Sequence, residues 1–153
     1  MGNTYYYRLG KNICLGITMK VKLYRQGKTK ELEDFVKQVN LPEAFGYDAP
    51  FIFEAHSKGQ FRFVNAFRLQ EVDGVIMPRF IHILLDDSIK RSRVAIDLMK
   101  QAEAYLNLLG YTRAFAYILK DNRLMSILAQ KFGYNKDKED DKAFYYFKCI
   151  GGN

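Results

Sequence analysis

This chain of 153 residues is poor in cysteine, histidine, proline and tryptophan: it has two cysteines, two histidines, three prolines and no tryptophan. Cys14 and Cys149 are far apart in the sequence, and so are His56 and His82. The spacing therefore predicts neither a disulfide framework nor a metal site of the zinc-finger kind. No motif marks either cysteine as a nucleophile. We expect a reduced, intracellular setting.

The sequence also lacks an apolar run long enough to cross a membrane. The apolar stretch ICLGITM at 13–19 is short, and KVK follows it where a signal peptide would have small residues and a cleavage site. We therefore expect neither a signal peptide nor a membrane partner. The expected location is the cytoplasm.

Positive charge is in excess, with 24 lysines and arginines against 17 aspartates and glutamates and a formal net charge of +7. Such an excess favours an acidic partner. The basic stretch from Arg8 to Lys37, preceded by Tyr5, Tyr6 and Tyr7, gives nucleic-acid binding as a minor alternative. The mixed run KDKEDDK at 136–142 is typical of a solvated loop.

Apolar residues recur with the period of strands in some segments and of helices in others. The predicted strands cover 19–24, 51–57, 61–69, 75–85, 114–119 and 143–150, and the predicted helices cover 29–40, 88–109 and 122–133. This order predicts an α/β fold: a single domain with a mixed, mostly antiparallel sheet and helices on both faces. Two late strand-helix-strand units are expected to place parallel strands side by side. Residues 19–153 form the predicted domain, and 1–18 an N-terminal extension or an extra hairpin.

Residues that begin and end helices support these boundaries. Thr29 is the expected N-cap of the first helix, and Gly110 and Gly133 follow the second and third helices. The predicted buried stripe of the second helix consists of Val94, Leu98, Ala102, Tyr105 or Leu106, and Leu109. The predicted apolar face of the third helix consists of Leu124, Ile127, Leu128 and Phe132.

Two segments, LLDDSIKRSRVAIDLM at 84–99 and DNRLMSILAQKFGY at 121–134, carry a resemblance to a known family. In this order of elements, they resemble the GNAT superfamily of N-acetyltransferases over residues 19–150. One marker of that superfamily is R/Q-x-x-G-x-G/A at a helix start, which Lys90 opens and Ala95 closes. A second marker is N-x-x-x-x-x-x-Y-x-K-x-G-F, in which Asn122, Lys131, Gly133 and Tyr134 fall on the expected positions.

The resemblance implies acetyl-CoA as the cosubstrate. Backbone near Leu84 and Leu85 would hold the acyl carbonyl, and the helix start would hold the pyrophosphate with Asn122 as a further contact. The residues implied at the helix start are Lys90, Arg91, Ser92, Arg93, Val94 and Ala95. Arg93 replaces the glycine that lets backbone approach phosphate. Two interpretations stay open: Arg93 binds phosphate, or the basic turn is neutralised by Asp86 and Asp87.

The catalytic positions depart from the family pattern. Ala129 replaces the tyrosine that usually protonates the leaving thiolate. Arg79 and Ile81 stand where a base is usual, and His82 is one residue out of phase. His82 is either a displaced general base or a core histidine. Weaker candidates are Glu54 and Glu71 for a base, and Tyr117, Tyr145 and Tyr146 for an acid.

Two functions follow from the resemblance. The first is transfer of an acetyl group from acetyl-CoA to an unidentified amine acceptor, through a degenerate active site. The second is a catalytically silent GNAT-fold protein that binds a protein partner, similar to small bacteriophage GNAT-like proteins of the virion or its assembly, in which case the location is the virion. No metal is predicted in either case.

Overall fold

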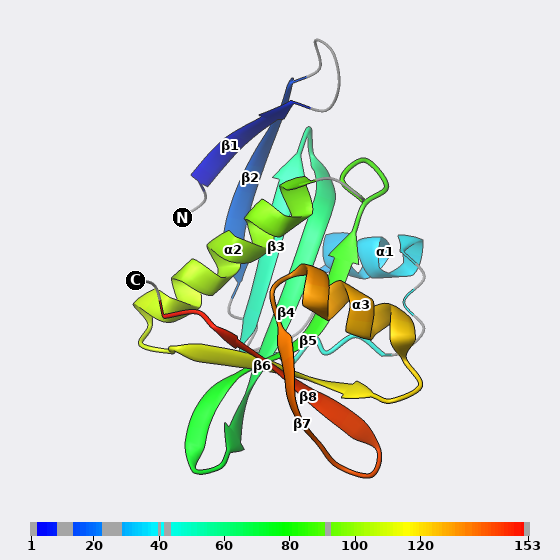
Figure 1. Ribbon diagram of the computed structural model, residues 1–153. Helices are drawn as coiled ribbons and strands as arrows, with labels where there is room; N and C mark the ends of the chain where they lie inside the picture. Colours follow the sequence, from blue (N-terminus) through cyan, green and yellow to red (C-terminus); the bar gives the residue numbers. More distant parts are fainter. Residues whose placement is uncertain are drawn as a thin grey trace. The chain divides into compact units, whose positions relative to one another are not determined.

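The computed structural model describes residues 3–8, 14–22, 29–39, 41, 44–90 and 93–151, which form eight strands and three helices (Figure 1). The elements are β1 (Asn3–Arg8), β2 (Cys14–Lys22), α1 (Lys30–Gln38), β3 (Phe51–Ser57), β4 (Gln60–Val72), β5 (Val75–Leu85), α2 (Arg93–Leu108), β6 (Arg113–Leu119), α3 (Arg123–Lys131), β7 (Asn135–Glu139) and β8 (Ala143–Cys149). Two compact units share these elements, one with residues up to 67 and 82–98, the other with 68–81 and 99 onward. Because β4, β5 and α2 run through both, the chain is a single α/β domain, as predicted.

The first unit contains strands in the order β1-β2-β3-β4-β5. Strands β1 to β4 pair antiparallel, as predicted for the hairpin from β3 to β4. That hairpin turns at Lys58 and Gly59, which have φ angles of 53° and 73°. Glycine adopts positive φ at little cost, so this pair suits a tight turn.

Helix α1 begins and ends close to the predicted residues. Thr29 is its N-cap, and the Thr29 hydroxyl accepts a hydrogen bond of 3.3 Å from the amide of Leu32. Leu32 and Phe35 are the buried residues of the helix. The ring of Phe35 stacks on Phe61 with a centroid distance of 5.3 Å. The cap and the helical spacing of apolar residues confirm this prediction.

The second unit contains strands in the order β4-β5-β6-β8-β7. Strands β5 and β6 are parallel, with Arg79 opposite Phe115, which confirms the first predicted strand-helix-strand unit. The second prediction of parallel neighbours is wrong, because β6 and β8 pair antiparallel from Arg113↔Cys149 to Leu119↔Ala143. Strand β7 lies between α3 and β8 in the chain, and its hairpin with β8 reverses the direction.

Strand β7 occupies the segment predicted to be a solvated loop. Its residues lack apolar alternation because they are mostly exposed. Aromatic rings of β8 stabilise it instead: Lys136 lies 4.4 Å from the ring centroid of Phe144, and Lys138 lies 4.8 Å from that of Tyr145. An ion pair of 3.0 Å joins Lys138 to Asp73 in the turn between β4 and β5.

Helix α2 begins later than predicted, at Arg93 rather than at residue 88, and Asp86–Lys90 form a turn before it. The predicted stripe is confirmed in both units, with Val94 and Leu98 buried in the first and Ala102 and Leu106 in the second. Leu109 is an exception, because it lies beyond the end of the helix and is 49% exposed.

Helix α3, at Arg123–Lys131, begins and ends within two residues of the prediction, but its buried face differs in part. The side chain of Asn122 caps it by accepting from the amide of Met125 at 3.1 Å. Leu124 and Ile127 are 83% and 63% exposed, so the predicted apolar face is wrong at these two positions, whereas Phe132 is 4% exposed as predicted. The side that packs is narrower and is centred on Ala129, which is 2% exposed. Apolar spacing indicates one face of a helix, but it does not say how much of that face meets a neighbour.

A buried polar network joins α2 to β8 in the second unit. Lys148 Nζ lies 2.6 Å from Glu103 Oε1 and donates to the carbonyl of Phe132 at 2.8 Å. Tyr134 donates to Glu103 Oε2 at 3.2 Å. Burial raises the pKa of Glu103, and the hydrogen bond and charge of Lys148 oppose this only in part. Burial also raises the pKa of Tyr134 well above its usual value.

Candidate functional site

A turn at the end of β5 leads into α2 and contains the basic segment singled out in the sequence. The amide of Asp86 donates to the carbonyl of Arg62 at 2.9 Å, which ties the turn to β4. The amides of Ile89 and Lys90 donate to the carbonyl of Asp86 at 3.1 and 3.2 Å. Ile89 is fully buried, so an apolar anchor holds a segment that is otherwise charged.

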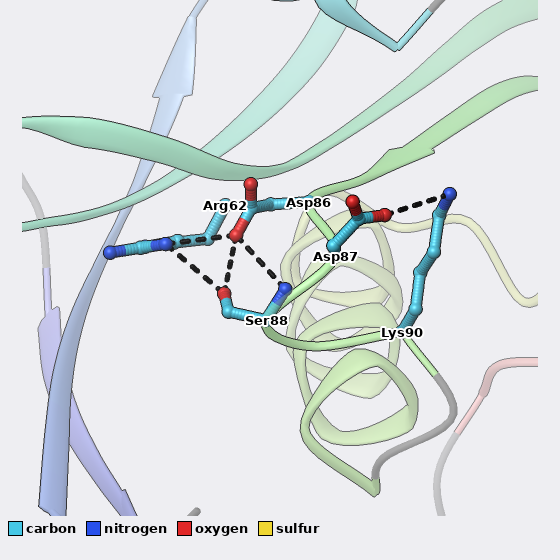
Figure 2. A network of polar contacts seen from close by, with 5 residues as sticks. All are labelled: Arg62, Asp86, Asp87, Ser88 and Lys90. Atoms are coloured by element: carbon cyan, nitrogen blue, oxygen red, sulfur yellow. Dashed lines mark hydrogen bonds and ion pairs between the residues drawn. The ribbon is translucent and has the colours of Figure 1, made fainter.

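Side chains of the turn form the polar network drawn in Figure 2. Arg62 Nη1 donates to Asp86 Oδ2 at 2.8 Å and to Ser88 Oγ at 3.1 Å. The amide of Ser88 donates to the same carboxylate oxygen at 3.1 Å, and its hydroxyl bonds that oxygen too. Lys90 Nζ lies 3.2 Å from Asp87 Oδ1. Each carboxylate of the turn therefore has a cationic partner. This supports the interpretation that Asp86 and Asp87 neutralise the positive charge of the turn as far as Lys90.

The surroundings of Asp86 favour its ionised form. Burial alone would raise its pKa, but hydrogen bonds from Ser88 and Arg62, together with the Arg62 charge, hold the pKa below its usual value of 3.8. A lowered pKa in the folded state means that ionised Asp86 contributes stability above its unfolded pKa, and that this contribution is lost as the pH falls.

Asp86→Asn should therefore reduce the acid sensitivity of the fold. Between about pH 6 and about pH 3, the wild-type free energy of unfolding should fall more than that of the variant, by about 1 kcal/mol. Urea unfolding at several pH values measures this difference. Asp87→Asn is the control, because Asp87 is 95% exposed and its ion pair contributes little. Equal acid sensitivity of wild type and Asp86→Asn would contradict the account.

The first turn of α2 has a different charge balance from the turn before it. It contains no acidic residue, and Arg93 is exposed and forms no ion pair with any residue that the structure describes. The first amides of a helix have no intrahelical acceptor, so they add partial positive charge. Arg91 and Ser92 lie outside the described residues. In the described part of the chain, Arg93 therefore has no carboxylate within ion-pair distance.

This arrangement fits an anion at the start of α2 better than at the preceding turn. Ser88, Ile89 and Lys90 already donate their amides to Asp86. The guanidinium of Arg93 and the amides of the helix start match the oxygens of a diphosphate such as that of CoA. Val94 and Ala95, predicted to bind the cofactor, are each 4% exposed, so only their backbone suits that role.

The predicted acyl contacts and base lie on β5. Leu84 is buried and Leu85 is half-buried, so their backbone groups rather than their side chains suit binding. His82 is 8% exposed, and its ring stacks on Phe45 at 5.0 Å. Its carbonyl accepts a hydrogen bond of 3.0 Å from Asn65 Nδ2. This burial favours the interpretation of His82 as a core histidine.

Further candidates lie in the second unit. Asn122 uses its side chain as the cap of α3. Tyr117 donates to Asp140 Oδ2 at 2.8 Å, and this hydrogen bond raises the pKa of Tyr117. Tyr146 is 3% exposed. Ala129, at the position where the resemblance to the GNAT superfamily implies an acid, is 2% exposed.

Sequence reasoning did not single out Arg62, Ser88 or His56. Arg62 meets Asp86 across 24 positions of sequence, so no local pattern could pair them. His56 is two residues from Glu54, and alternation along a strand puts both on one face. Their Nε2 and Oε1 atoms are 3.2 Å apart. That spacing was the one available signal for the pair.

Comparison with solved structures identifies the fold. No protein-family model and no curated protein matches the sequence. Among solved structures, an acetyltransferase of the GNAT family from Streptococcus pneumoniae matches with a TM-score of 0.60 and 12% identity over 87% of this chain and 99% of that chain. An aminoglycoside 6'-N-acetyltransferase from Acinetobacter haemolyticus matches at 0.59 and 16% over 79% and 94%. The chain therefore has the GNAT acetyltransferase fold.

One similar structure contains CoA. The paia N-acetyltransferase from Thermoplasma acidophilum was solved in complex with coenzyme A, and it matches with a TM-score of 0.52 and 13% identity. The match covers 64% of this chain and 59% of that one. In the described ranges of this chain, no helix is both long and apolar enough to span a membrane.

Proposed function

We propose that this protein is an acetyl-CoA-dependent N-acetyltransferase that acts on an amine, in the cytoplasm. The observation that carries the proposal is the start of α2 within a GNAT fold: Arg93 is exposed there without an ion-pair partner among the described residues, and the first turn has no acidic residue. An anionic cosubstrate offsets charge of this kind.

Acetyl-CoA would bring the acyl thioester, and this chain's residues would hold it. The proposed pyrophosphate contacts are Lys90, Arg91, Ser92, Arg93, Val94 and Ala95. Backbone groups of Leu84 and Leu85 are proposed to bind the acyl carbonyl. With Ala129 in the acid position, rate enhancement would come mainly from holding amine and thioester together.

A second candidate function is a silent binding protein with the same fold. Two observations favour it: Ala129 is 2% exposed, and His82 is 8% exposed. Neither position therefore presents a proton donor or acceptor to solvent. A protein partner, as in a virion or its assembly, would then replace the amine acceptor.

Isothermal titration with acetyl-CoA tests the proposal. We expect wild-type binding with a dissociation constant in the range of about 1–100 μM, and Arg93→Glu should weaken it at least tenfold, about 1.4 kcal/mol. Lys58→Glu is the matched control, because it makes the same charge change at the exposed turn between β3 and β4.

The outcomes separate the two candidates. No acetyl-CoA binding by the wild-type protein, or equal weakening by both variants, contradicts the proposal. Binding without release of free CoA in the presence of spermidine, kanamycin or a lysine-containing peptide favours the silent binding protein.

A further inference from the structure

A carboxylate and an imidazole form a pair on β3 that the proposed cosubstrate site does not use. Glu54 is 2% exposed, and its Oε1 lies 3.2 Å from Nε2 of His56. The side chain of His56 is 27% exposed. One member of the pair is therefore buried, and the other is accessible to a dissolved molecule.

The hydrogen bond defines which nitrogen is available. When Glu54 is ionised and His56 is neutral, the carboxylate can only accept a hydrogen bond, so Nε2 of His56 carries the hydrogen and Nδ1 carries the lone pair. A histidine whose second nitrogen is held by a carboxylate is fixed in one tautomer and one orientation. Nδ1 is thus an oriented proton acceptor.

Aromatic packing fixes the ring further. The His56 ring lies 4.2 Å from that of Phe61, and Phe61 stacks on Phe35 of α1 with an interplanar angle of 17°. The register between β3 and β4 shifts between Ala55 and His56. Such bulges redirect side chains and are frequent beside active sites. The imidazole is therefore positioned by packing as well as by its hydrogen bond.

The pair lies near the turn that precedes α2, within the same unit. Arg62 on β4 accepts the backbone hydrogen bond of Asp86. Two residues further along β4, Val64 is opposite Glu54. Two residues back from Asp86 along β5 is Leu84, a proposed acyl contact. Glu54 and Leu84 thus flank the same stretch of β4.

We propose that His56 is the general base for the amine acceptor and that Glu54 is its positioning residue; this inference rests on the proposed acetyl transfer. The nitrogen of a primary amine forms a bond to the thioester carbonyl carbon, and the carbon–sulfur bond breaks. The amine proton passes to Nδ1 of His56. The departing thiolate takes a proton from solvent, and the imidazolium returns its proton to solvent.

Charged residues neighbour the pair in backbone register or in sequence on each adjoining element. Strand β2 places Lys20 opposite Glu54 in the register, β4 carries Arg62 next to Phe61, and α1 carries Asp34 next to Phe35. Substitutions must therefore leave these charges in place, and Glu54→Gln and His56→Gln do so.

Nitrogen NMR of the imidazoles tests the geometry without any ligand. The chain has two histidines, so the His56 signals are assigned by comparison with His56→Gln. We expect a single tautomer with the hydrogen on Nε2 in wild type and a mixture in Glu54→Gln. A wild-type His56 with the hydrogen on Nδ1 would overturn the inference.

Kinetics test the chemistry, with CoA release from acetyl-CoA measured against spermidine, kanamycin and a lysine-containing peptide. His56→Gln should lower kcat about 100-fold, with acetyl-CoA affinity unchanged, and should abolish the rise of kcat with pH that a general base causes. Gln60→Ala, at the exposed start of β4, is the control.

Three outcomes are decisive. Loss of rate and of the pH-dependent rise supports the inference. Full activity of His56→Gln overturns it, as does a wild type that binds acetyl-CoA but acetylates none of these amines. Failure of the wild type to bind acetyl-CoA contradicts the proposed function itself.

Discussion

Lys148→Met should lower the free energy of unfolding by about 3 kcal/mol at neutral pH, because it removes the cation from a buried pair. In the folded protein, Lys148 Nζ lies 2.6 Å from Glu103 Oε1, and Glu103 is 4% exposed. Methionine fills a similar volume, so the loss reports on charge rather than on a cavity. Urea unfolding followed by circular dichroism measures it.

The loss of stability in Lys148→Met should be larger at neutral pH than at acidic pH. The folded-state pKa of Glu103 is already raised by burial above its usual 4.5. A raised pKa means that stability is greatest below the unfolded pKa and falls as the pH rises through the folded pKa. Without Lys148 the pKa of Glu103 rises further, so the fall becomes larger. The variant should therefore recover part of its stability at about pH 4.5.

A double variant isolates the carboxylate as the cause. Glu103→Gln combined with Lys148→Met keeps the shape and removes the buried charge. It should be more stable at neutral pH than Lys148→Met alone, and its stability should lack the recovery at lower pH. Stability of Lys148→Met equal to wild type, or a loss that is the same at every pH, would contradict this account.

Ile89→Ala should lower the free energy of unfolding by about 3 kcal/mol, the second large effect that the structure predicts. Ile89 is 0% exposed, although the turn around it is polar. Truncation removes buried apolar surface and leaves a cavity beneath the turn that precedes α2. Thermal and urea unfolding at neutral pH measure the loss.

The neighbouring residue gives the control. Lys90→Ala removes an ion pair with Asp87 whose side chains are 56% and 95% exposed, so it should change stability by less than about 0.5 kcal/mol. Comparing the two variants shows whether ion pairs or the buried side chain of Ile89 contribute more to the stability of the turn. A larger effect of Lys90→Ala than of Ile89→Ala would falsify the apolar-anchor account.

Local signals in the sequence predicted the helix ends and most of the strands. Thr29 caps α1, and Gly110 and Gly133 have φ angles of 105° and 92° after α2 and α3. These features depend on one residue and its immediate neighbours, so they can be read without tertiary information. The same holds for the parallel pair of β5 and β6, which follows from a strand-helix-strand connection.

The predictions from the sequence are wrong where segments that are distant in the sequence pack together. Strand β7 has no apolar alternation, because its stability comes from pairing with β8 and from rings such as Phe144. The predicted buried stripe of α3 is exposed at Leu124 and Ile127. In both cases the deciding contact comes from residues outside the local window.

The candidate site also has features that the sequence predicts and features that only the tertiary structure shows. The sequence by itself determined the fold class and the basic segment before α2, because residue type and spacing define them, and the resemblance to the GNAT superfamily implied that Ala129 replaces an acid. Only the tertiary structure decided that Asp86 pairs with Arg62 and that Arg93 begins a helix with no acidic first turn. The physical reason is that charge and hydrogen bonding act between atoms that folding brings together, and separation along the chain does not encode those distances.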